Sequence, residues 1–266
     1  MDNLRRSLAP IPSQAWDEID ELARQTLVAG LSARKFVDVD GPHGMDFACV
    51  SLGRLEVPEK QKPKDVRYGV HQVLPLVETR IAFQLNQWEL DNLLRGARDP
   101  ELDALTEAAR KLAKFEEEAV YNGFKPAGIA GLHTSIEAKS VDMPLEVHGC
   151  IDAITDGQGI LAQAGVQGDC ALVVNPDIWK FMARNTQGGT VRQLVERQIG
   201  GPVIFSSTVK DAVLASMRGG DAELTVGQDI AIGYSHHDST TVQFYMTESF
   251  TFRVVAPEAF IQFKVA

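Results

Sequence analysis

The residues that could do chemistry in this chain are few and scattered. The six histidines stand apart from one another except for His236 and His237. Neighbours on a strand point to opposite faces, so this pair would be a poor chelate and is interpreted as a loop pair. Cys49, Cys150 and Cys170 are an odd number of cysteines with no close spacing. That pattern argues for reduced thiols in a cytosol and against a disulfide framework.

The acidic run 116–118 and Trp88 are the two remaining local features. Consecutive positions on a helix fan out, so the three glutamates are interpreted as a solvated helix face rather than a metal site. Trp88 follows a predicted helix N-cap at Asn86, where it could stack an aromatic cofactor such as a flavin. Packing of Trp88 against the next helix is the favoured alternative.

Short catalytic motifs are missing from the sequence. It has no phosphate-binding glycine loop, no paired-cysteine or zinc-protease motif, and no nucleophile elbow. A chain of this size without a converging nucleophile, base or ligand set favours a binding or structural protein over an enzyme. Residues gathered from distant parts of a chain leave no short motif, so an enzyme stays open. We predict no catalytic residue, no metal ligand and no required cofactor.

Composition narrows the class of partner. The chain has 266 residues and a net charge of -10, with 36 acidic against 26 basic residues. A surface of that sign repels phosphate backbones and anionic lipid, so we expect neither nucleic acid nor membrane as a partner. The start MDNLRRSLAP lacks an apolar stretch behind its arginines, and no apolar run is long enough to span a bilayer. A soluble cytoplasmic protein is expected.

Helical spacing and alternation predict the main elements. Trp16, Ile19, Ala23 and Leu27 recur at helical spacing, which predicts an amphipathic helix from about residue 13 to about residue 34. Asp99 followed by a proline predicts the start of a second helix, which ends at the Asn-Gly pair 122–123. Alternating residues predict strands at 36–40 and 77–85.

Residues 45–80 are the most unusual stretch. Short β-like pieces flank a charged, proline-bounded tip at 58–64. Two arms of about 12 to 15 residues would reach roughly 40 to 50 Å. A two-stranded ribbon of that length is marginal in water, so a neighbouring subunit is expected to hold it. An ordinary hairpin folded back on its own domain is the alternative.

The rest of the chain divides by its pattern. Residues 126–220 alternate helical pieces with buried strands such as 171–174, which predicts a compact subdomain. From residue 221 the pattern is mostly β. The fold class is therefore α+β.

Eight segments together resemble the encapsulin shell proteins, also called the linocin bacteriocin family. They keep their order from residue 4 to residue 259, so the resemblance covers essentially the whole chain, and 126–215 matches least. The segments are LRRSLAP (4–10), GLSARKFVDVDGP (30–42), LPLVETR (74–80), WELDNLLRG (88–96), AKFE (113–116), RGGD (218–221), GQDIAIGY (227–234) and TESFTFRVVAPEA (247–259).

The resemblance implies the fold of tailed-phage major capsid proteins. Residues 1–44 would hold the N-terminal helix, which would face the shell interior, and the entry to the peripheral domain. Residues 45–80 would be an extension loop laid along a neighbour. Residues 81–125 and 221–266 would form the peripheral domain, and 126–220 the axial domain.

The resemblance also implies a function. Such subunits assemble into an icosahedral nanocompartment around a cargo enzyme, held by a peptide at the cargo's C-terminus. The cargo is a ferritin-like protein for iron storage or a dye-decolorizing peroxidase active in oxidative stress. Positions matching the peptide groove are Leu27, Leu31, Arg34, Asp38, Ile230, Ile232 and Tyr234.

The spacing of the groove positions on the first helix supports a binding surface independently of the resemblance. Leu27, Leu31 and Arg34 share one helix face, so two apolar sockets would end in a charge able to hydrogen-bond a peptide carboxylate or carbonyl. Ordinary packing of a helix on a sheet is the alternative.

The resemblance further implies a pore loop at the five-fold axis, where a polar, glycine-bearing loop could pass small ions. The residues at that place are Arg184, Asn185, Thr186, Gln187, Gly188, Gly189 and Thr190. A peptidase-like enzyme or bacteriocin and a viral capsid protein are the rival interpretations of the whole chain.

Overall fold

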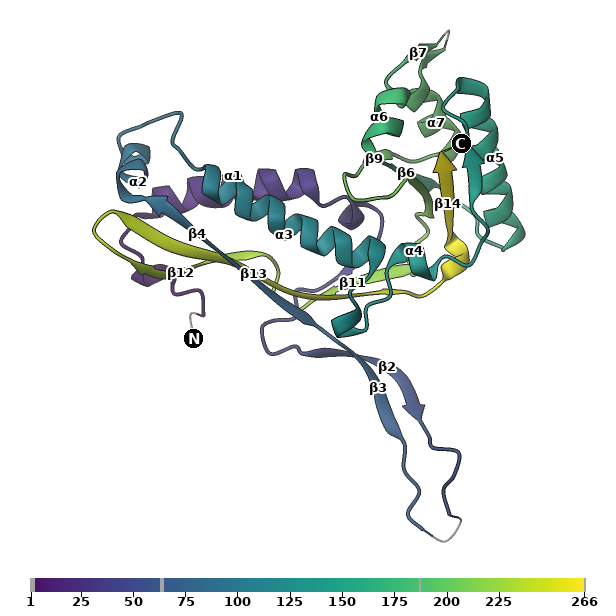
Figure 1. Ribbon diagram of the computed structural model, residues 1–266, viewed down its shortest axis with the longest axis horizontal. Coiled ribbons are helices and arrows are strands. Elements are labelled where there is room, and N and C mark those ends of the chain that lie inside the picture. Colours follow the sequence, from purple (N-terminus) through teal and green to yellow (C-terminus); the bar gives the residue numbers. More distant parts are fainter. Residues whose placement is uncertain (1–2, 63–64, 187, 266) are drawn as a thin grey trace.

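The computed structural model describes residues 3–62, 65–186 and 188–265. Figure 1 shows two bodies and a two-stranded ribbon that projects away from both of them. The first body carries the long helices α1 and α3, and the second carries α5, α6 and α7. The α+β class expected from the sequence is confirmed.

The first body is a sheet covered by two helices. Helix α1 (Ser13–Gly30) and helix α3 (Asp103–Asn122) pack on each other and on the sheet. The predicted apolar face of α1 is buried, and the Trp16 ring meets Phe244 edge to face at 5.4 Å between centroids. The strands of the sheet are β1 (Asp38–Asp40), β4 (Val77–Asn86), β11 (Ala222–Val226), β12 (Ala231–His237) and β13 (Thr241–Val254).

Strand β13 organises that sheet. It pairs antiparallel with β4 over residues 241–250, with β12 nearer its start and with β11 nearer its end. β1 then adds in parallel to β11. Strand β12 therefore lies at an edge of the sheet, next to α1.

Helix α1 ends four residues earlier than its spacing predicts. It stops at Gly30, and a short 3-10 turn, η2 (Ala33–Lys35), follows. A Cβ on Gly30 would lie 3.1 Å from the Cβ of Ala113, so the missing side chain lets α3 approach closely. Helix α3 begins at Asp103 rather than near Asp99, with an acidic residue in its first turn.

The second body has its own five-stranded sheet, in the order β5-β14-β10-β6-β9. Its central strands β6 (Cys170–Val174) and β10 (Ala212–Ser216) are buried throughout, which explains their unbroken apolar runs. The other elements are β5 (Val141–Met143), β9 (Val203–Phe205), β14 (Phe260–Val265), α5 (Val147–Gln163), α6 (Pro176–Met182) and α7 (Val191–Ile199).

The C-terminal strand corrects one predicted boundary. Residues 221–266 were all expected in the peripheral domain, but β14 pairs antiparallel with β10 and parallel with β5 in the second sheet. The chain thus returns to the second body after completing the first. Smaller elements are η1 (Arg6–Leu8), α2 (Gln87–Leu94), η3 (Lys125–Ala127), α4 (Leu132–Ser135), β7 (Asn185–Thr186), β8 (Gly189–Thr190) and η4 (Pro257–Ala259).

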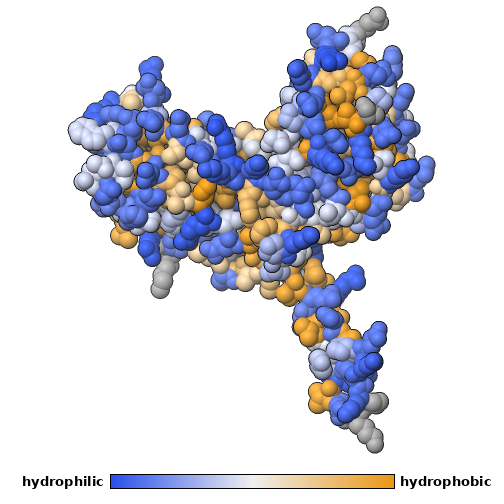
Figure 2. Space-filling model, in the orientation of Figure 1, coloured by the Kyte–Doolittle hydropathy of each residue, from blue (hydrophilic) through white to orange (hydrophobic). Residues whose placement is uncertain are grey.

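The projecting ribbon is the hairpin of β2 (Cys49–Glu56) and β3 (Val70–Pro75). Figure 1 shows it leaving the first body, so the alternative of a hairpin folded back on its own domain is wrong. Apolar side chains along it are exposed, and Figure 2 shows hydrophobic patches on its surface. An isolated hairpin with such a surface needs a covering partner. The exposed residues are Leu55, Val57, Val66, Tyr68, Val70 and Val73.

Candidate binding groove

A groove with a volume of about 560 Å³ runs between helix α1 and the start of strand β12. Five of the seven predicted peptide-binding residues line it: Leu27, Leu31, Arg34, Ile230 and Ile232. The helix supplies one apolar wall and the strand supplies the other. The helix and the sheet edge therefore do not pack closely along this line, as they would in ordinary helix-on-sheet packing, but enclose an open groove between them.

Asp38 and Tyr234 do not line this groove. The Asp38 carboxylate accepts a hydrogen bond from the Gly220 backbone N–H at 2.5 Å, so it ties β1 to the turn before β11. The Tyr234 hydroxyl lies 2.6 Å from Nδ1 of His237, and its ring is packed in the first core. Both residues hold the surrounding sheet together instead.

The groove also has lining residues that the sequence analysis missed. The lining residues on α1 could have been found from helical spacing, because they lie three or four positions from Leu27, Leu31 or one another. No local signal marks Arg6, which forms an ion pair with Asp20 at 2.6 Å. The missed residues are Arg6, Asp20, Ala23, Arg24, Val28, Lys35, Asp229 and Ala231.

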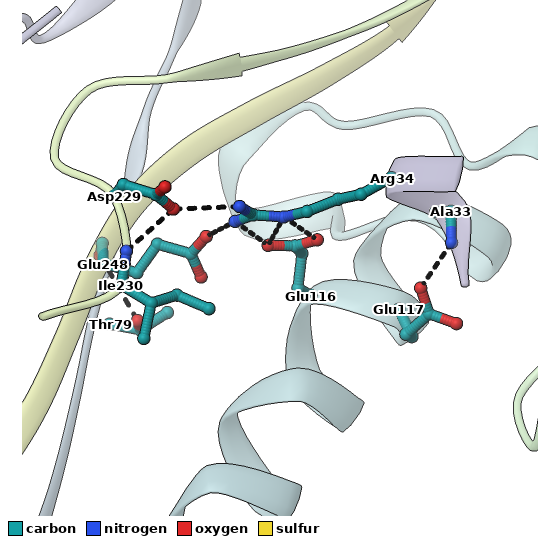
Figure 3. A network of polar contacts seen from close by, with 8 residues as sticks. All are labelled: Ala33, Arg34, Thr79, Glu116, Glu117, Asp229, Ile230 and Glu248. Atoms are coloured by element: carbon teal, nitrogen blue, oxygen red, sulfur yellow. Dashed lines mark hydrogen bonds and ion pairs between the residues drawn. The ribbon is translucent and has the colours of Figure 1, made fainter. Parts of the chain in front are cut away.

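Arg34 is held by three carboxylates rather than offered to a ligand (Figure 3). Its Nε and Nη2 donate to Glu116, with Nη2 to Oε2 at 2.6 Å, and Nη1 donates to Asp229 at 2.9 Å. Nη2 also donates to Glu248. The expected role of this charge as a donor to a peptide is therefore replaced by a structural one at the end of the groove.

Burial makes this network unusual. The side chains of Glu116 and Glu248 are both 0% exposed, so the expectation of a solvated glutamate face at 116–118 is wrong. Burial raises the pKa of Glu248 well above its ordinary value, and the neighbouring Glu116 carboxyl raises it further.

Glu117 is a third buried carboxyl, next to Glu116 on α3. It accepts hydrogen bonds from the Ala33 N–H at 2.8 Å, from the Ser206 hydroxyl at 3.2 Å and from the Ser32 hydroxyl. Burial raises its pKa to about 7. Glu117 therefore joins α3, the η2 turn and the second body at one point.

The predicted pore residues form a small hairpin at the outer end of the second body, where Figure 1 labels β7. The Thr186 hydroxyl donates to the Gly189 carbonyl at 2.7 Å, and Thr190 caps α7. The Arg184 guanidinium lies 5.3 Å from the Phe181 ring centroid. Gln187 lies outside the described residues.

Trp88 does not pack against the following helix as favoured. Its side chain is 67% exposed, and the Arg95 guanidinium lies 5.9 Å from its ring centroid. A flavin stacked there stays a prediction. Within residues 3–62, 65–186 and 188–265, no three His, Cys, Asp or Glu side chains are placed to hold a metal ion. None of the helices in that part of the chain could cross a membrane.

Solved structures of capsid proteins have a similar fold. A virus-like particle from Pyrococcus furiosus superposes with a TM-score of 0.63 at 15% identity, over 92% of this chain and 97% of that one. The capsid of the Myoviridae phage XM1 superposes with a TM-score of 0.55 at 13% identity, over 90% of this chain and 92% of that one. The fold is that of virus capsid subunits.

Sequence comparison is more specific. The family described as "Encapsulating protein for peroxidase" matches residues 1–251. The type 1 encapsulin shell protein of Rhodospirillum rubrum is 41% identical over 97% of this chain and 95% of its own length. That of Rhodococcus erythropolis is 34% identical over 98% of this chain and 99% of its own. The chain belongs to the encapsulin shell protein family, so it is a subunit of a self-assembling shell that forms a nanocompartment.

Proposed function

We propose that this shell is icosahedral and encloses a cargo enzyme whose C-terminal peptide binds in the groove between α1 and β12. The groove itself is the observation that carries the proposal. It has apolar walls from Leu27, Leu31, Ile230 and Ile232, and it is open to a ligand. A shell subunit with no ligand to bind would be expected to fill such a space with its own side chains.

The charges around the groove fit a short peptide better than a small anion. Arg6, Arg24 and Arg34, all in its lining, are already paired with carboxylates of the chain, which leaves Lys35 as the remaining basic residue there. Affinity would therefore come mainly from apolar burial, at about 25 cal/mol per Å² removed from water.

The family description names a peroxidase, so we propose a dye-decolorizing peroxidase as cargo, with a role in oxidative stress. A ferritin-like cargo for iron storage would use the same groove. The cargo is identified by purifying shells from the native host and sequencing the protein inside them.

Two finer proposals follow from the same assembly. The hairpin 184–190 would line a pore for small ions, since it is polar and lies at the outer end of the second body. The bacterial cytoplasm would be the location of the shell.

The test of the groove is a pair of substitutions in its wall. Leu31→Asp places a charge on the apolar floor, and Val28→Asp places one at the exposed rim, where it does not threaten folding. Gln14→Asp is the control, because it adds a negative charge to an exposed position of α1 outside the groove.

We expect both groove variants to form intact shells that are empty of cargo, while the control loads normally. Electron microscopy measures shell integrity, and the cargo-to-shell ratio on a gel measures loading. Normal loading of Val28→Asp and Leu31→Asp in intact shells would place the cargo site elsewhere.

A further inference from the structure

A carboxyl group is enclosed where the two bodies of the subunit meet. Glu117 belongs to α3 in the first body, and only 1% of its surface is exposed. Its Oε1 accepts a hydrogen bond from the Ala33 N–H at 2.8 Å. Its Oε2 accepts from the Ser206 hydroxyl at 3.2 Å and from the Ser32 hydroxyl, which lies 2.8 Å from the Tyr121 hydroxyl. One carboxyl therefore bonds to both bodies at once.

Ser206 begins the segment of the second body that covers this carboxyl. It follows β9 directly, and its hydroxyl accepts hydrogen bonds from the N–H groups of Thr208 and Val209. The Val209 side chain is buried, and the Lys210 N–H lies 3.5 Å from Nε2 of His133 on α4. We call residues 206–210 the junction segment. It is a short turn that meets the first body through Glu117 and meets α4 through His133.

No cation neutralises Glu117 among the residues that the structure describes. Its neighbour Glu116 is paired with Arg34, and Figure 3 shows the two carboxyl groups leaving α3 in different directions. A buried carboxylate without a cation is costly, and a bound proton avoids that cost. The hydroxyls of Ser32 and Ser206 can accept from a protonated carboxyl as well as donate to an ionised one. The closed junction therefore favours the proton, and any motion that admits water removes this preference.

The other titratable groups around the junction supply no counter-charge. On α3, Glu116 adds charge of the same sign, and burial raises the pKa of Tyr121, which keeps it neutral. On α4, burial and the charge of Lys210 lower the pKa of His133, and Asp211 acts in the opposite direction. These groups are unchanged in the variants below, so a comparison between variants isolates Glu117.

We propose that Glu117 makes the junction a pH-dependent latch. With its proton bound, the junction segment is closed over α3. When the proton passes to water, the segment opens, the carboxylate becomes solvated, and the second body is freed to shift relative to the first. A shell built from such subunits would be held more rigidly at this joint in acid than above neutrality.

The size of the effect follows from proton binding in the closed and open states. Burial raises the pKa of Glu117 to about 7 in the closed state, whereas a solvated carboxyl has the ordinary value of 4.5. The closed state is therefore favoured most below pH 4.5 and loses this advantage as the pH rises to about 7. Between pH 5 and pH 8 the ratio of open to closed junctions should rise roughly 70-fold through this carboxyl. Glu117→Gln carries no charge and should abolish this rise.

Hydrogen exchange of assembled shells, read by mass spectrometry, measures the opening. A peptide covering 206–210 reports on the junction segment, and a peptide covering β6 reports on unfolding of the second body, because β6 is buried throughout. Protection is compared at each pH after correction for the intrinsic exchange rate. Glu118→Gln is the matched control, since it makes the same change at the next position of α3, where the carboxylate is partly exposed.

We expect the protection of 206–210 in wild type, relative to Glu117→Gln, to fall roughly 70-fold from pH 5 to pH 8. The Glu118→Gln shells should follow wild type. The β6 peptide should stay protected on the time scale on which 206–210 exchanges, because the junction opens without unfolding of the second body. The wild-type profile should also level off above about pH 7, a signature that needs no substitution.

Three results would overturn the latch. Parallel pH profiles of wild type and Glu117→Gln would show that this carboxyl does not control the opening. Exchange of 206–210 and β6 at the same rate would show that Glu117 affects only global stability. If Glu117→Gln fails to fold, a wild-type protection of 206–210 that is constant from pH 5 to pH 8 would be the contradicting result.

Discussion

Replacement of Glu117 by glutamine should remove a pH dependence that is built into the junction of the two bodies. The carboxyl is 1% exposed, and the amide and hydroxyl groups of Ala33, Ser32 and Ser206 hold it without a cation among its hydrogen-bond partners. Its pKa rises from 4.5 to about 7 on folding. The folded chain therefore binds this proton more tightly than the unfolded chain.

The direction and the size of the pH effect on the free energy of unfolding follow from this difference in pKa between the folded and the unfolded chain. The proton stabilises the fold fully below pH 4.5, and the stabilisation is lost as the pH rises through about 7. At 1.36 kcal/mol for each pH unit between the two values, the loss is about 3 kcal/mol per subunit. Glutamine carries no charge at any pH, so the variant should be about as stable as wild type near pH 4.5 and more stable at pH 8.

Other groups near Glu117 do not produce the same effect. Burial raises the pKa of Tyr121, and burial lowers that of His133, whose ring lies 5.9 Å from the Tyr121 ring. Glu116 carries its own charge beside the Arg34 guanidinium. All of these remain in the variant, so the difference between wild type and Glu117→Gln isolates one carboxyl.

The assay is thermal melting of assembled shells between pH 5 and pH 8. For a chain of this size, about 3 kcal/mol corresponds to roughly 6 °C or more in melting temperature at pH 8, with little difference at pH 5. Glu118→Gln is the control, since that partly exposed carboxylate bonds only Asn122 at 2.5 Å among the described residues. A constant gap between wild type and Glu117→Gln across this pH range would refute the reasoning.

Two further substitutions test the packing around the groove. Arg34→Met should lower stability by about 3–5 kcal/mol, because Glu116 and Glu248 would stay buried without their cation, and melting at pH 7 and pH 5 should show the deficit shrinking in acid. Gly233→Ala should cost about 1–3 kcal/mol, because its Cβ would lie 2.3 Å from Cζ of Tyr245. Shortening Tyr245 to alanine should relieve that clash, so Gly233→Ala should cost less stability in a Tyr245→Ala chain than in wild type, and an equal cost in both chains would contradict this.

The sequence predicted what local pattern controls. The spacing of Trp16, Ile19 and Leu27 identified the buried face of α1, and the proline-bounded charged tip identified a ribbon that needs a partner. The leucines on that same helix also pointed to one wall of the groove.

Long-range partners could not be predicted in this way. Arg34 meets Glu116 and Glu248, which lie 82 and 214 residues further along the chain, and no spacing rule connects them. The largely apolar segment 260–265 predicts a strand, but nothing in its sequence indicates which of the two sheets that strand joins. Consecutive glutamates usually face water, and only the turn after α1 explains why two of them are buried here.

The most direct test of the central claim is the mass of the purified chain in solution, measured by light scattering on a sizing column. We predict a closed particle many tens of times heavier than the 29.1 kDa chain. We also predict that Val57→Asp together with Val70→Asp on the projecting hairpin yields folded subunits that do not close into shells. Wild-type protein that stays a folded monomer or dimer at working concentration would contradict the assignment of this chain as a shell subunit.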